Sequence, residues 1–129
     1  AYRMASVYKE IGKFNQDVTI KVEEASDQGM YLPYYQNLKK LYKMVENQDK
    51  DEIVDLEVYR ICLFSIEQYV RKFQSDEVPQ DDIHEFLQAV IESTQNTQTT
   101  SDKTDELKRD ILDRVSQTQQ AVMRAYGGT

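Results

Sequence analysis

One segment, residues 51–74, carries apolar side chains around most of the circumference of a helix, and this feature constrains the fold most strongly. One stripe recurs at steps of three and four residues and comprises Ile53, Leu56, Tyr59, Leu63, Ile66, Val70 and Phe73. A second set covers much of the remaining surface and comprises Val54, Val58, Ile61, Cys62 and Phe64. A helix that is apolar on most sides is normally surrounded by other helices. The pattern therefore predicts that residues 51–74 form the central helix of a bundle.

Four other segments have apolar residues at helical spacing on one face, and turn-forming residues separate them. They predict further helices over residues 2–26, 33–47, 81–93 and 104–126. Pro33 suits the first turn of its helix, where a missing N–H costs no hydrogen bond, and Gly127 follows the last helix. Residues 18–22 also fit a strand because their apolar side chains alternate, but the helical pattern runs through them. We predict an all-α fold, a single domain over residues 1–129 with about five helices.

The tract at residues 93–104 contains only polar side chains, mostly Ser, Thr, Gln and Asn. A segment with no apolar residue to bury has little reason to pack against a core. We therefore predict a flexible polar linker over 93–104, placed before the C-terminal helix. The apolar stripe of that last helix is thinner than the others, which suits a helix that packs on one neighbour or on another chain.

The net charge of -7 is concentrated in the middle of the chain. Residues 49–93 carry 4 Lys+Arg against 12 Asp+Glu, a net charge of -8, whereas residues 1–48 and 94–129 are close to neutral. Such a surface repels phosphate backbones and anionic membranes, and it would suit a basic protein partner, although a plain solvated surface explains the charge equally well. The chain also lacks a run of about 18 apolar residues, the minimum for a membrane span. We expect a cytoplasmic protein with no membrane association, and its start at Ala1 fits a whole gene product that has lost an initiator Met.

The side chains needed for catalysis are scarce, since the sequence has one His, one Cys and four Gly. Cys62 lies in an apolar run and is expected to be a small buried hydrophobe. His84 follows Asp81 by one helical turn, but two ligands do not make a metal site, and we expect an exposed histidine. The acidic residues at 49–52 lack the spacing of a calcium loop and suit a helix start. The sequence predicts no enzyme, no cofactor and no metal.

The first functional hypothesis is a non-catalytic interaction protein, an assembly subunit or adaptor that acts through amphipathic helix faces. The long apolar stripes of the first and last helices favour self-association, although an ordinary antiparallel bundle has the same spacing. We expect a protein partner and a homo-oligomer. The candidate interface residues are Ile11, Phe14, Tyr35, Tyr42, Val115, Val122 and Tyr126.

The second hypothesis is a small helical subunit of a larger nucleoprotein complex. Tyrosines and lysines interleave in the segment 33–47, and tyrosine rings can stack on bases while lysines contact phosphates. The candidate nucleic-acid contacts are Tyr35, Lys39, Lys40, Tyr42 and Lys43. The acidic middle segment argues against this hypothesis unless that surface faces away from the nucleic acid.

Overall fold

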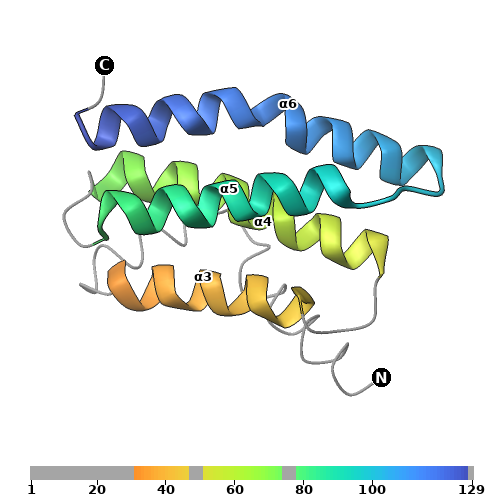
Figure 1. The fold of residues 1–129 in the computed structure, drawn as a ribbon, viewed down its shortest axis with the longest axis horizontal. Helices are drawn as coiled ribbons and strands as arrows, with labels where there is room; N and C mark the ends of the chain where they lie inside the picture. Colours follow the sequence, from red (N-terminus) through yellow and green to blue (C-terminus); the bar gives the residue numbers. More distant parts are fainter. Residues whose placement is uncertain (1–30, 47–50, 74–77, 128–129) are drawn as a thin grey trace.

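The structure is a computed structural model that describes residues 31–46, 51–73 and 78–127. These ranges contain four helices and no strand: α3 (Tyr31–Glu46), α4 (Glu52–Phe73), α5 (Gln80–Asn96) and α6 (Asp102–Ala125) (Figure 1). The predicted all-α bundle is confirmed: the described ranges contain four helices, where about five were predicted for residues 1–129. The predicted helix 2–26, the alternative strand at 18–22 and the candidates Ile11 and Phe14 lie outside the described residues.

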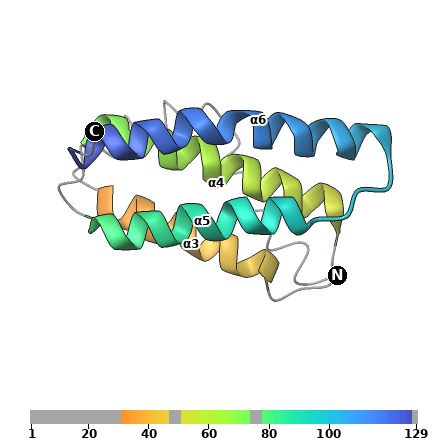
Figure 2. The same cartoon turned by 45° about the horizontal axis from the view of Figure 1, so that its top comes forward.

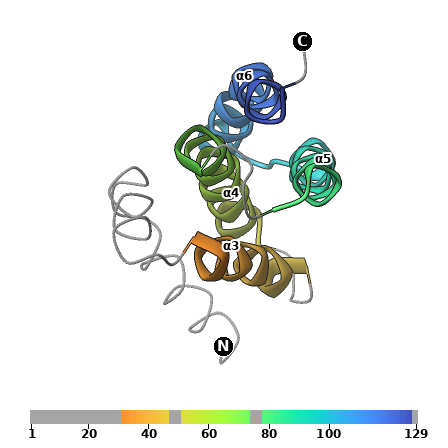
Figure 3. The same ribbon diagram turned by 90° about the vertical axis from the view of Figure 1, so that its left-hand side faces the viewer.

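The four helices alternate in direction along the chain, and α4 lies at their centre (Figures 1 and 2). The end-on view shows α6, α5 and α3 arranged around α4 (Figure 3), and α4 packs against each of them. Most α4 side chains are buried, as its apolar circumference predicted. Among the apolar α4 side chains whose burial is described, Ile53 is 50% exposed, because it lies in the first turn. The prediction of a central third helix is therefore confirmed, although its stripe begins later than expected.

Local side chains explain where two of these helices begin. The Oδ1 atom of Asp51 accepts hydrogen bonds from the backbone N–H groups of Ile53 and Val54, both at 3.1 Å. Ser101 starts α6 with a capping box, in which its side chain accepts from the Thr104 N–H while the Thr104 hydroxyl accepts from the Ser101 N–H. These contacts satisfy N–H groups that have no partner inside the helix.

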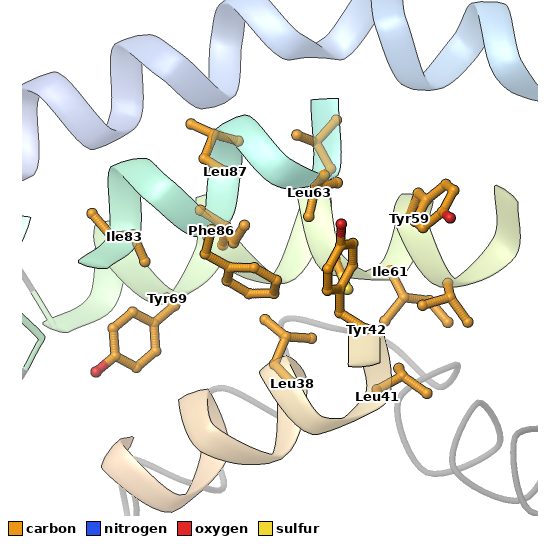
Figure 4. Close-up of a cluster of buried hydrophobic side chains, with 14 of the residues drawn as sticks. Leu38, Leu41, Tyr42, Tyr59, Ile61, Leu63, Tyr69, Ile83, Phe86 and Leu87 are labelled. Atoms are coloured by element: carbon orange, nitrogen blue, oxygen red, sulfur yellow. The ribbon is translucent and has the colours of Figure 1, made fainter. Parts of the chain in front are cut away.

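The Tyr35 and Tyr42 side chains of α3 point into the bundle and join it to α4 and α5. The Tyr35 ring packs edge-on against Phe86 of α5 at 5.9 Å and lies 5.4 Å from the Tyr69 ring of α4. The Tyr42 ring contacts Phe86 at 5.6 Å and Tyr59 at 6.0 Å. In Figure 4 the Tyr42 side chain reaches from α3 toward the apolar side chains of α4 and α5. Aromatic pairs of this geometry stabilise the packing beyond the burial of apolar area, so these rings help attach α3 to α4 and α5.

The connection between α5 and α6 is shorter than the predicted linker, because helices take up both ends of the tract 93–104. Only residues 97–101 lie between the helices, and their polar groups make hydrogen bonds to the bundle. The Thr97 hydroxyl donates to the Ser93 carbonyl at 2.7 Å, and the Lys108 ammonium donates to the Thr97 carbonyl at 2.8 Å. Hydroxyl side chains therefore fasten this segment through hydrogen bonds, which an apolar pattern cannot reveal.

A buried ion pair attaches α6 to α4. The carboxylate of Glu67 is 0% exposed, and Arg114 of α6 donates two hydrogen bonds to it, Nε to Oε1 at 3.2 Å and Nη2 to Oε2 at 2.8 Å. The Thr118 hydroxyl donates to Oε1 at 3.3 Å, and the Arg71 guanidinium lies 3.6 Å from Oε2. Burial alone would raise the pKa of Glu67, but the hydrogen bonds and charges of Arg114, together with Arg71 and Thr118, hold it below its ordinary value.

Candidate partner-binding surface

A cleft of about 510 Å³ opens where the start of α4, the end of α5 and the connection 97–101 meet. Two floor residues from α4, Asp55 and Tyr59, are each 3% exposed. The other described residues that line the cleft are polar and more exposed: Glu52, Ser93, Asn96, Thr97 and Gln98. The positions of Glu52, Asp55 and Tyr59, three and four residues apart, place them on one face of α4. The described lining thus has two carboxylates and no lysine or arginine.

Ser93 and Asn96 of α5 line the cleft, and Ser93 is hydrogen-bonded to Tyr42 of α3. The hydroxyls of Tyr42 and Ser93 are hydrogen-bonded at 2.7 Å, and the Tyr42 hydroxyl also donates to the Ala89 carbonyl at 3.3 Å. Burial raises the pKa of Tyr42 despite the opposing hydrogen bond to Ser93. Burial also raises the pKa of Tyr59, and the charge of Asp55 raises it further. Both phenols therefore stay protonated at neutral pH.

The rim of the cleft is fixed by a contact between α4 and the connection 97–101. The Thr100 backbone N–H donates to Oε2 of Glu52 at 2.7 Å, and the Thr100 hydroxyl donates to Oε1 of the same carboxylate. The Thr100 hydroxyl lowers the pKa of Glu52, and the Thr104 hydroxyl and the Thr100 N–H add to the effect. Glu52 therefore remains an anion at the mouth of the cleft.

The exposed side of α5 is an acidic face that leads to this cleft. Asp81, Glu85, Gln88 and Glu92 are exposed and follow each other at steps of three and four residues. Asn96, one turn after Glu92, lines the cleft. We call Asp81, Glu85, Gln88 and Glu92 the α5 acidic face. The whole of α5 contains no lysine or arginine.

The remaining carboxylate of α5, Asp82, is engaged within the bundle. The Tyr35 hydroxyl donates to its Oδ2 at 2.6 Å, and the Lys39 ammonium lies 3.1 Å from its Oδ1. Burial alone would raise the pKa of Asp82, but the bonds from Tyr35 and Lys39 and the charge of Lys39 lower it. Lys39 is thus the ion-pair partner of Asp82. The next residue, Lys40, is exposed on α3.

The structure places the described members of the predicted interface in contacts within the chain. Tyr35, Tyr42 and Val122 are buried, and they line no exposed face. Val115 is partly buried against the core, as is Tyr126, whose hydroxyl donates to the Val78 carbonyl at 2.7 Å. These side chains pack within the bundle, and a role for them in contacting a partner stays a prediction.

The predicted nucleic-acid contacts are not brought together as a binding surface. Base stacking needs an exposed ring face, but the rings of Tyr35 and Tyr42 pack against Phe86 inside the bundle. Lys40 and Lys43 are exposed on α3, whereas Lys39 binds Asp82. The alternation of tyrosine and lysine therefore reflects a buried and a solvated side of one helix.

Residues 93–98 were predicted as part of a linker, and the acids near residue 52 as a helix start, so the cleft was missed in the sequence. One available signal was that residues 73–102 contain no lysine or arginine. His84 is exposed as predicted, and its ring nitrogen Nε2 lies 3.3 Å from the Gln80 amide. Cys62 is fully buried as predicted, and burial raises the pKa of its thiol.

Comparison with protein-family models, with curated proteins and with solved structures finds no match to this chain. In the described ranges, no helix is both long and apolar enough to cross a membrane. No group of three or more His, Cys, Asp or Glu side chains in these ranges could hold a metal ion. A functional inference therefore starts from the chemistry of the α5 acidic face and the cleft.

Proposed function

We propose that this protein is a non-catalytic binding protein that recognises a basic segment of a partner protein through the α5 acidic face and the adjoining cleft. The observation that best supports the proposal is the exposed acidic row of α5, which carries no compensating lysine or arginine. A surface of one charge sign attracts ligands of the opposite sign and orients them during approach. A basic segment laid along α5 would meet Glu85 and Glu92 and end at the cleft.

The rigid support of this surface also favours a binding role. The α5 acidic face lies opposite a buried row on the same helix, which includes Ile83, Phe86, Leu87, Val90 and Ile91. The backbone of the face is therefore held on a packed helix, so binding need only order its exposed side chains and not the helix itself. Exposed charge pairs contribute about 0.2–1 kcal/mol each, so we expect a binding affinity of moderate strength that falls as salt is added.

An apolar self-association surface has less support in the described residues. The exposed large hydrophobic side chains there are Leu32, Ile53 and Met123, and they come from three different helices. Ile111 and Val122 of the last helix are buried within the chain. We therefore propose self-association only through charged surfaces, in which the exposed Lys40 of one copy would contact the α5 acidic face of another.

The test is a titration of the protein with a fluorescent peptide of alternating arginine and glycine, followed by anisotropy at low and physiological ionic strength. The double variant Glu85→Gln/Glu92→Gln should weaken binding about tenfold, at about 0.7 kcal/mol for each lost charge. The matched control Glu106→Gln/Asp113→Asn removes two exposed charges from α6 and should change the affinity less than about twofold. Equal weakening by both double variants would mean that net charge alone attracts the peptide, and the proposal would fail. Light scattering of the peptide-free protein reports whether a second copy competes for the same face.

A further inference from the structure

We propose that the cleft is an anchor pocket for one arginine side chain of the basic segment, an inference that rests on the proposed function. The pocket would give the interaction sequence preference, because the acidic face alone attracts any cation. The inference is carried by the hydrogen-bonding groups, the size and the position of the cleft.

The hydrogen-bonding groups of the cleft come from three elements and are rich in acceptors. Glu52 and Asp55 contribute carboxylate oxygens from α4, Ser93 and Asn96 contribute oxygens from α5, and the connection adds the side chains of Thr97 and Gln98. A guanidinium group has five N–H donors in a planar fork and no acceptor, so it matches acceptors that surround it from several sides. The anionic state of Glu52, held by the bonds from Thr100, keeps one of these acceptors charged.

The size and floor of the cleft also fit a planar cation on a long stem. Its volume of about 510 Å³ exceeds the space that a compact ammonium group fills. Asp55 and Tyr59, each 3% exposed, close the floor of the cleft, so an occupant reaches its acceptors from the open, polar side.

The position of the cleft makes the occupant part of a longer segment. Asn96 at the cleft and Glu92 on the α5 acidic face are one helical turn apart. A peptide that lies along α5 can therefore place one side chain in the cleft while its neighbouring cations meet Glu85 and Glu92. The partner is thus a protein segment with several basic residues, of which one is an arginine at a fixed place.

The experiment compares two peptides on the full chain: one of lysine and glycine, and the same peptide with its central lysine replaced by arginine. The arginine peptide should bind wild-type protein about tenfold more tightly than the lysine peptide. Asp55→Asn and Ser93→Ala should remove this preference, while Glu85→Gln/Glu92→Gln should weaken both peptides by the same factor and preserve the preference. Asn96→Ala/Gln98→Ala changes only exposed rim side chains and should also reduce the arginine preference. This variant tests the pocket even where the buried Asp55 variant fails to fold.

The outcomes separate this inference from the proposed function. If both peptides bind equally and only the Glu85/Glu92 variant weakens them, the anchor pocket is overturned while the acidic face stands. If neither peptide binds, both proposals are overturned. If the arginine preference persists in the Asn96→Ala/Gln98→Ala and Ser93→Ala variants, the arginine is read elsewhere and the cleft is not its site. Circular dichroism of each variant confirms that the fold is retained.

Discussion

Removal of Arg114 tests whether the buried ion pair determines how α6 is held. Arg114→Ala deletes the two hydrogen bonds at 3.2 and 2.8 Å and leaves the Glu67 carboxylate fully buried with Thr118 and the more distant Arg71. Leaving one partner of a buried pair without its counterpart costs about 3–5 kcal/mol. Arg114 is 34% exposed and Arg71 remains at 3.6 Å, so solvent and the second cation reduce the expected cost to about 2–3 kcal/mol.

The assay is urea unfolding at neutral pH, followed by the helical circular dichroism signal. The matched control is Arg109→Ala on the same helix, where the side chain is exposed and the free energy of unfolding should change by less than about 0.5 kcal/mol. Glu67→Gln, combined with Arg114→Ala in a double-mutant cycle, should give a coupling energy of about 1–2 kcal/mol. An Arg114→Ala cost as small as that of the control would refute the claim that this pair fixes α6.

The same pair predicts a pH dependence of known sign. The folded-state pKa of Glu67 lies below the ordinary value of 4.5, so the unfolded chain binds the proton more readily. The contribution of the pair is therefore fully present above that ordinary value and is lost as pH falls through the lower folded-state pKa. The difference in unfolding free energy between wild type and Glu67→Gln should shrink as pH is lowered from 7 to below 4, in parallel urea titrations. A difference that grows on acidification would contradict the sign.

Three further predictions concern packing, capping and reactivity. Leu63→Ala, at a fully buried position of α4, should lower the free energy of unfolding by about 2–5 kcal/mol, and a near-neutral effect in urea unfolding would place α4 outside the core. Ser101→Ala should cost about 1 kcal/mol by removing the cap of α6, whereas Ser101→Asp should retain most of the stability in the same assay. Cys62 should react with a thiol reagent only as fast as the protein unfolds, because its thiol is buried and its pKa is raised; rapid modification of the native protein would contradict this placement.

The apolar pattern was sufficient to predict the helices because burial and helical periodicity leave the same mark on a sequence. The central position of residues 51–74 could be predicted because the apolar side chains of that segment cover most of the helix circumference. The helix bounds shifted by only a few residues at most, since start signals such as Asp51 are local features, whereas the Ser101 cap lay within the predicted linker. Pro33 indeed lies in the first turn of α3, where it removes no helical hydrogen bond.

The polar contacts could not be predicted because they join residues far apart in the sequence. Glu67 and Arg114 give no sign of each other in the sequence, and Glu67 resembles any charged residue on the solvent side of a helix. The sequence does not distinguish a tyrosine at an interface from one in the core. The Tyr35 ring packs in the core, while its hydroxyl donates to the Asp82 carboxylate. The cleft was missed for the same reason, since its walls come from two helices and a connection that carries no apolar residue.

The most direct test of the proposed function is a nuclear magnetic resonance titration of the labelled protein with the arginine–glycine peptide. We expect the largest amide shift changes in α5, the start of α4 and the connection 97–101, with α3 and the exposed face of α6 nearly unaffected. Changes centred on α3 or α6, or small changes spread evenly over all four helices, would contradict binding at the α5 acidic face.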